Sequence, residues 1–150
     1  MLFRSIRETH DMSRLAGSHQ AGQHQHEAKL ICVLGAAGGG RDKWKRPELG
    51  KIATKYCDAI ILTNEDPYEE SPEKILEDVG KGIEGSVFIK ILDRRTAIKK
   101  ALQSAKTDDV VIITGKGAEP WLMSNHGKIP WDDRRVVREE LAHVKTTPLP

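Results

Sequence analysis

From residue 30 onward the sequence alternates short apolar, β-branched runs with segments of helical spacing, and this alternation restricts the possible folds more than any other feature. The expected strands are Leu30–Leu34, Ala59–Thr63, Val87–Leu92 and Val110–Thr114. Strands that are apolar on both faces and separated by helices are typical of a mostly parallel sheet covered on two sides. We therefore predict a three-layer α/β domain.

Four segments have the spacing or the start signals of amphipathic helices. The first places its apolar residues at i, i+3, i+4 and i+7, namely Leu49, Ile52, Ala53 and Tyr56. Each of the other three follows a residue that can cap a helix N-terminus: Ser71 with Pro72 after it, Asp93, and Asp132 or Asp133.

The first 28 residues differ from the rest, because they hold four of the six histidines and show no sustained apolar period. We expect a poorly ordered or degenerate arm over residues 1–28, one domain over 29–145 and a tail over 146–150. Histidine-rich tracts can bind metal ions, but these spacings match no closed ligand set, so we predict no metal site.

Charge and cysteine content exclude several classes of function. The chain has 24 basic and 22 acidic residues, and this near balance argues against general attraction to nucleic acid or to a membrane surface. Cys32 and Cys57 form no CxxC motif, and no signal segment or membrane-length apolar stretch is present, so a reduced, cytoplasmic setting is expected.

A glycine-rich, basic segment follows the first expected strand. Gly35 and Gly38 to Gly40 allow close approach of the backbone to a ligand, and Pro47 suits the first turn of a helix. Four cations crowd the start of that helix, where an anion is favoured: Arg41, Lys43, Lys45 and Arg46. The alternative interpretation is an ordinary glycine turn before a solvated basic helix start.

Three loops are expected side by side, since the carboxyl ends of parallel strands meet at one edge of a sheet. The loop over 35–46 is basic, the loop over 64–71 carries Glu65, Asp66, Glu69 and Glu70, and the loop over 115–121 holds Lys116 and Glu119. A pocket shared by these loops suits a zwitterion. Each loop taken alone also fits a solvated turn.

Five motifs in this order resemble the C-terminal domain of Mur ligases, most closely of the MurE type. They are Gly39 to Pro47, Thr63-Asn64-Glu65-Asp66-Pro67, Asp93-Arg94, Gly115-Lys116-Gly117-Ala118-Glu119 and Asp132-Asp133-Arg134. The resemblance covers about residues 30–143 and implies a Rossmann-like mixed sheet. It also implies an ATP-dependent ligase that adds an amino acid to a UDP-MurNAc peptide during peptidoglycan biosynthesis.

The resemblance also implies roles for individual residues. Arg41 would meet the amino acid carboxylate, and Lys43 would be the catalytic cation that approaches nucleotide or acyl phosphate. Further phosphate contacts would come from Lys45, Arg46, Asp93 and Arg94. The amino acid would be bound by Asp66, Pro67, Tyr68, Gly115 and Glu119.

Departures from the family pattern refine these expectations. Diaminopimelate-specific members carry an arginine where this chain has Tyr68, so we expect a lysine-like substrate. Ala118 stands where the family often has histidine. The phosphate loop, the magnesium ligands and the UDP-binding domain have no counterpart, so ATP and Mg²⁺ would be bound mainly by a domain absent from this chain.

We therefore expect a fragment or split subunit, with a possible separate ATPase-domain chain as its partner and no activity by itself. Two other classes of function stay open. A free-standing Rossmann-like nucleotide-binding module explains the glycine loop but gives the acidic loop no role. A non-catalytic interaction domain would fold without responding to ligands.

Overall fold

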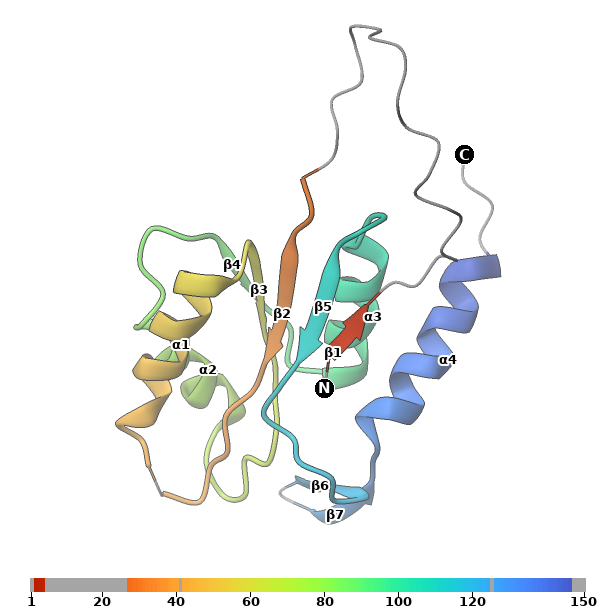
Figure 1. Cartoon of the computed structure of the whole chain (residues 1–150). Helices are drawn as coiled ribbons and strands as arrows, with labels where there is room; N and C mark the ends of the chain where they lie inside the picture. Colours follow the sequence, from red (N-terminus) through yellow and green to blue (C-terminus); the bar gives the residue numbers. More distant parts are fainter. Residues whose placement is uncertain (1, 5–26, 41, 125, 147–150) are drawn as a thin grey trace, which may run out of the picture.

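The structure, a computed structural model, describes residues 2–4, 27–40, 42–124 and 126–146, arranged in three layers (Figure 1). The elements in chain order are β1 Leu2–Arg4, β2 Leu30–Leu34, α1 Lys45–Tyr56, β3 Ala59–Leu62, α2 Pro72–Gly80, β4 Phe88–Lys90, α3 Arg94–Ser104, β5 Val110–Ile113, β6 Trp121–Ser124, β7 Gly127–Pro130 and α4 Asp133–Thr146.

The main sheet has the strand order β1-β5-β2-β3-β4. Strands β2, β3, β4 and β5 are parallel to their neighbours, whereas β1 pairs antiparallel with β5. In this register Cys32 of β2 lies between Ile60 of β3 and Ile112 of β5. The predicted α/β fold with a mostly parallel, mixed sheet is confirmed, and β1 is an addition that the sequence patterns did not predict.

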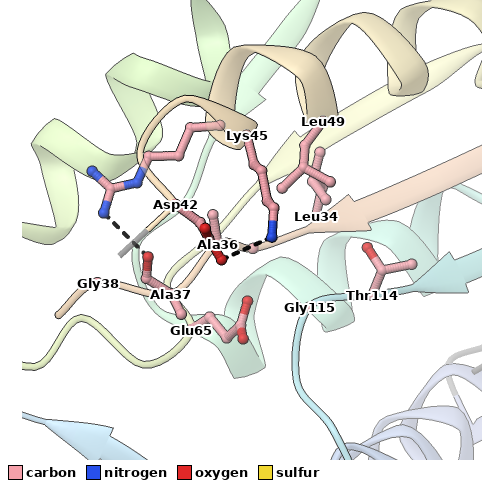
Figure 2. A pocket seen from close by; sticks show the side chains of 12 residues that line it. Leu34, Ala36, Ala37, Gly38, Asp42, Lys45, Leu49, Glu65, Thr114 and Gly115 are labelled. Carbon is pink, nitrogen blue, oxygen red and sulfur yellow. Dashed lines mark hydrogen bonds and ion pairs between the residues drawn. The ribbon is translucent and has the colours of Figure 1, made fainter. Parts of the chain in front are cut away.

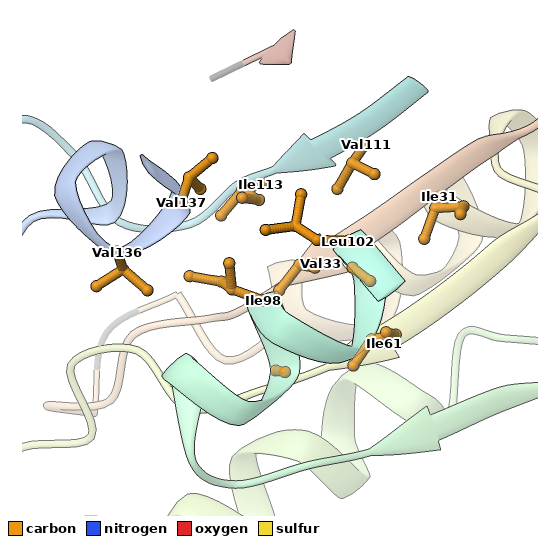
Figure 3. Packing of buried hydrophobic residues seen from close by; sticks show 11 residues of the cluster. Ile31, Val33, Ile61, Ile98, Leu102, Val111, Ile113, Val136 and Val137 are labelled. Atoms are coloured by element: carbon orange, nitrogen blue, oxygen red, sulfur yellow. The ribbon is translucent and has the colours of Figure 1, made fainter. Parts of the chain in front are cut away.

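Two apolar cores fill the space on either side of the sheet, because successive residues of a strand point to opposite faces. On one face Ile31 and Val33 pack with side chains from α3 and α4, among them Ile98, Leu102 and Val137 (Figure 3). On the other face Cys32 and Leu34 pack with side chains from α1 and α2, among them Ala53, Ile75, Leu76 and Val79.

The predicted helix starts are confirmed. Helix α2 begins after Ser71, whose hydroxyl accepts a hydrogen bond from the Lys74 backbone N–H. Helix α3 begins after Asp93, which accepts one from the Thr96 backbone N–H at 2.8 Å. Such caps satisfy donors that the first helical turn leaves free.

Two expectations need correction. Strand β4 is shorter than predicted and forms the open edge of the sheet, so Val87 and Ile89 are exposed rather than buried on both faces. The expected loop over 115–121 ends in a strand, because Trp121–Ser124 and Gly127–Pro130 form the β6–β7 hairpin, for which no strand was predicted. Its strands have four residues each and lie outside the main sheet, which leaves only a weak period-two signal.

The histidine-rich arm falls almost entirely outside the described residues, as does the end of the predicted tail. Within the part of the chain that is described, no helix is long and apolar enough to cross a bilayer.

Candidate functional site

A cavity of about 530 Å³ opens at the carboxyl ends of β2 and β5 (Figure 2). Helix α1, which follows β2, packs on one face of the sheet, and helix α3, which precedes β5, packs on the other. The strand order therefore reverses between β2 and β5, where the cavity lies. Ligand crevices of α/β sheets form at such places. The cavity is lined by Leu34, Gly35, Ala36, Ala37, Gly38, Asp42, Lys45, Arg46, Leu49, Glu65, Thr114 and Gly115.

The Glu65 carboxylate sits between two glycines of this cavity. A Cβ on Gly115 would lie 2.4 Å from Glu65 Oε2, and a Cβ on Gly35 would lie 3.3 Å from the same atom. The two residues therefore leave room for the carboxylate because they have no side chain. Glu65 is 8% exposed, and among the described residues none donates a hydrogen bond to its oxygens.

Burial raises the pKa of Glu65 to about 7. The positive charge of Arg94 opposes this increase, while the negative charge of Asp66 adds to it. The sequence placed Glu65 in an acidic loop but did not single it out as a site residue. Its position shortly after the buried strand β3, next to glycines that follow β2 and β5, was the available signal.

Asp66 lies beside Glu65 and joins three segments. Its Oδ2 is 2.9 Å from the ammonium of Lys116, and its Oδ1 accepts a hydrogen bond from the Met123 backbone N–H at 2.7 Å. The Asp66 carbonyl accepts another from Gly38 at 2.7 Å. Asp66, predicted to bind substrate, thus connects the β6–β7 hairpin to the glycine-rich loop.

Pro67 and Tyr68 lie against that glycine-rich loop. A Cβ on Gly38 would lie 2.0 Å from the Pro67 carbonyl oxygen, so the two backbones are in direct contact. The Tyr68 ring lies over Gly39, with Cδ2 at 3.4 Å from where a Gly39 Cβ would be. Tyr68 itself has a positive φ of 52°.

The basic residues of the glycine-rich loop converge on Glu70. The Arg46 guanidinium binds both Glu70 carboxylate oxygens at 3.1 Å, and Lys43 Nζ lies 3.3 Å from one of them. The Gly40 backbone N–H donates to Glu70 at 2.6 Å. Bonding to Arg46 and Gly40 lowers the pKa of Glu70 to about 2. Lys43 keeps an exposed side chain, whereas Arg46 is 2% exposed.

Arg94 is also interior. It binds the Asp133 carboxylate at 2.9 and 2.7 Å and donates to the backbone carbonyls of Asn64 and Thr114. The roles of Arg46 and Arg94 as phosphate ligands stay predictions, and their burial argues against them. Asp93 is occupied as the cap of α3.

The remaining predicted residues lie around the rim. Lys45 Nζ pairs with Asp42 at 2.8 Å in the cavity wall, and Glu119 lies 3.4 Å from Lys116 with half of its side chain exposed. Gly115 borders Glu65, as described above. Arg41 lies outside the described residues. The structure thus gathers Asp66, Gly115 and Glu119 around Lys116 and Glu65.

No group of three or more His, Cys, Asp or Glu residues that could hold a metal ion occurs within the ranges that the structure describes.

The fold and the site together define a Rossmann-like α/β domain with a charged cleft at the carboxyl ends of its parallel strands. The chain belongs to the Mur ligase family, because the family model described as Mur ligase, glutamate ligase domain, matches residues 10–117. The resemblance found in the sequence is confirmed.

Two similar relatives are ligases of the same name. The chain is 51% identical over 116 residues to the UDP-N-acetylmuramoyl-L-alanyl-D-glutamate–2,6-diaminopimelate ligase of Aquifex aeolicus, which covers 77% of this chain and 24% of that protein. The ligase of the same name from Nitrosomonas europaea is 43% identical over 117 residues, 78% of this chain and 22% of that one.

A solved structure described as this same kind of ligase is similar with a TM-score of 0.74 and 35% identity. The similarity covers 81% of this chain and 25% of that chain. The chain therefore spans about a quarter of the length of the relatives that it matches.

Proposed function

We propose that this chain is the amino-acid-binding, C-terminal domain of an ATP-dependent ligase that adds an amino acid to a UDP-MurNAc peptide in peptidoglycan biosynthesis. Support comes from the family match and from relatives named as ligases of the same dipeptide. The chain corresponds to about a quarter of those relatives, so catalysis requires an ATPase domain, carried by a longer polypeptide or by a separate chain. A cytoplasmic location is part of the same proposal.

The buried position of the Glu65 carboxylate in the cavity is the observation that indicates the class of substrate. A carboxylate that is only 8% exposed is costly to ionise, and an ammonium group entering the cavity would stabilise its ionised form. Glu119 adds a second carboxylate at the rim, where its exposure keeps it available. These two groups suit the cationic end of an amino acid, while Arg41 stays the predicted partner of its carboxylate.

Tyr68 favours a lysine-like substrate over diaminopimelate. A second carboxylate on the substrate needs a cation beside it, and a phenol ring over Gly39 supplies none. Lys116 is a buried cation of a neighbouring loop, and its ammonium is already bound to Asp66 and Glu119. The named relatives act on 2,6-diaminopimelate, so this preference is a proposed difference from them.

The residues of this chain fit only a small part of an ATP site. Lys43 is an exposed cation able to meet a phosphoryl oxygen, and the described residues hold no group of three or more His, Cys, Asp or Glu that could bind a metal ion. ATP and Mg²⁺ therefore belong mainly to the ATPase domain. What this chain supplies is alignment of the amine near a cationic loop, which lowers the entropic part of the barrier.

An NMR titration of the chain with lysine, diaminopimelate and ATP tests the proposal. We expect lysine to shift the amide signals of Gly35, Glu65 and Gly115, and Glu65→Gln to abolish those shifts. Tyr68→Arg is expected to gain a response to diaminopimelate. Glu69→Gln is the matched control, since Glu69 belongs to the same loop but is exposed. Lysine shifts that persist in Glu65→Gln would contradict the site.

The cavity at the reversal of strand order also suits the alternative of a free-standing nucleotide-binding module. Shifts with ATP alone, centred on the glycine-rich loop, would favour that alternative. An interaction domain has its own supporting observation in the exposed side chains of Trp44, Ile52 and Tyr56 along α1. A folded chain that responds to no ligand would favour it.

A further inference from the structure

The Arg94 side chain lies against the loops that follow three neighbouring strands. It is the first residue of α3, and its guanidinium donates to Asn64 after β3 at 3.4 Å and to Thr114 after β5 at 3.1 Å. Its Nη1 also lies 3.2 Å from where a Gly35 Cβ would be, directly after β2. The ends of three neighbouring strands thus meet at one side chain.

Asp133 holds this guanidinium in place. The pair is bidentate, with Nε and Nη2 at 2.9 and 2.7 Å from the two carboxylate oxygens, and both side chains are buried. The Trp131 indole N–H donates to the same carboxylate at 2.8 Å. A planar, two-point pair fixes the orientation of the guanidinium as well as its distance.

Glu65 lies beside this fixed charge. Both Arg94 Nη1 and Glu65 Oε2 come within 3.3 Å of the position where a Gly35 side chain would begin. No described hydrogen bond joins Arg94 to Glu65, so Arg94 acts on it through charge and through loop position.

We propose that Arg94 is a positioning residue of the amino acid site: bound to Asp133, it fixes the three strand-end loops around Glu65 and keeps a positive charge next to that carboxylate. This inference rests on the proposed function, because it gives Glu65 the task of binding an amine. It replaces the phosphate contact expected for Arg94, since the guanidinium is interior and four of its five N–H groups already donate to oxygens of the chain.

Other charged groups also face Glu65 and enter the same balance. Asp66 from its own loop and Asp133 from α4 disfavour its ionised form, whereas Lys116 from the loop after β5 favours it. Asp42 and Lys45 line the same cavity from the glycine-rich loop and α1, and they are paired with each other. Among these charges Arg94 has the largest effect, and it favours the ionised form of Glu65.

The test is a ¹³C NMR titration of the Glu65 carboxyl group without ligand, with the signal assigned by Glu65→Gln. In Arg94→Gln we expect the pKa of Glu65 to rise by about 1 pH unit, because a nearby opposite charge is lost. A merely structural loosening would hydrate Glu65 and move its pKa down toward the ordinary value near 4.3. A downward shift in Arg94→Gln would therefore overturn the proposal.

Two further variants keep the test decisive if Arg94→Gln does not fold. Asp133→Asn is expected to lower the pKa of Glu65, since it removes a negative charge while keeping a partner for Arg94. Arg94→Lys retains the charge and is expected to leave the pKa close to that of the original protein. Arg95→Gln is the matched control on α3, where Arg95 pairs with Glu139 and Glu140 of α4 and does not line the cavity. If the pKa of Glu65 is the same in all four variants, the proposed role of Arg94 is refuted.

Lysine binding at pH 7 separates this inference from the proposed function. With the pKa of Glu65 raised from about 7 to about 8, the ionised fraction falls about fivefold, and we expect lysine to bind about fivefold more weakly in Arg94→Gln. The expected pKa shift without any lysine binding would support Arg94 and refute the amine site. Lysine binding together with an unchanged Glu65 pKa in Arg94→Gln would support the amine site and refute the role of Arg94.

Discussion

Arg46 and Glu70 form a bidentate ion pair, with both nitrogen-to-oxygen distances at 3.1 Å, across the glycine-rich loop. The same guanidinium donates to the Ala37 carbonyl, and the same carboxylate accepts from the Gly40 N–H. The loop is therefore held at two backbone points by one internal pair. The glycine-rich segment, which looks like an anion site in the sequence, binds the Glu70 carboxylate of the chain itself.

Replacing Glu70 tests how far this pair supports the fold. Glu70→Gln leaves the buried Arg46 guanidinium with Asp78 as its one charged partner among the described residues, so we expect a loss of about 2 kcal/mol in the free energy of unfolding at pH 7. Urea denaturation measures it, with exposed Glu69→Gln as control. Equal losses in the two variants would show that the pair contributes nothing specific.

In the protein without substitutions, low pH should remove the stabilisation that the Arg46–Glu70 pair provides. The pKa of Glu70 is about 2 in the folded state, below the ordinary value of 4.5, so its stabilisation is present above pH 4.5 and lost as the pH falls toward 2. We expect the stability difference between the protein and Glu70→Gln to shrink over this window. A difference that is constant from pH 6 to pH 2.5 would contradict the assignment.

Glu65 should show the opposite dependence on pH. Its folded pKa of about 7 exceeds the ordinary value of 4.5, so folding is favoured most below pH 4.5 and this advantage is lost as the pH rises through 7. Glu65→Gln cannot ionise, and we expect it to be more stable than the original protein by about 3 kcal/mol at pH 8. At pH 4 the two should be equal. Thermal or urea unfolding at both pH values measures this, and a destabilised variant at pH 8 would contradict it.

Lys116 provides a comparison between a buried and an exposed partner. Asp66→Asn removes the buried charge at 2.9 Å while keeping an acceptor for the Met123 N–H, and we expect a loss of about 3 kcal/mol. Glu119→Gln removes the half-exposed partner at 3.4 Å and should cost less than about 1 kcal/mol. The two unfolding curves are measured side by side, and the reverse order would refute this view of the network.

The contact between Gly38 and Pro67 predicts a strong effect of a single methyl group. A Cβ on Gly38 would lie 2.0 Å from the Pro67 carbonyl oxygen, so Gly38→Ala must separate the two loops, and we expect a loss above about 2 kcal/mol. Gly85→Ala is the control, because Gly85 has a φ of 71° but open space around it, and should cost about 1 kcal/mol. Lysine-induced NMR shifts should weaken in the first variant only.

The sequence by itself determined the layers of this protein. Alternating apolar residues such as Ile31 and Cys32 must face opposite sides of a strand, and Ser71 and Asp93 mark helix starts through local hydrogen bonds. These effects act between residues close in the chain, so they are visible in its pattern. Each family motif is also a run of consecutive residues, so the motifs were visible in the sequence as well.

Only the tertiary structure decided what the charged residues do. Arg46 reaches Glu70 across 24 positions and Arg94 reaches Asp133 across 39, so two cations expected at a ligand became interior partners of the chain's own carboxylates. Glu65 became the buried carboxylate of the cavity because Gly35 and Gly115, which follow two separate strands, leave room around it. Charge pairing depends on distances in space and on burial, and a linear pattern contains neither.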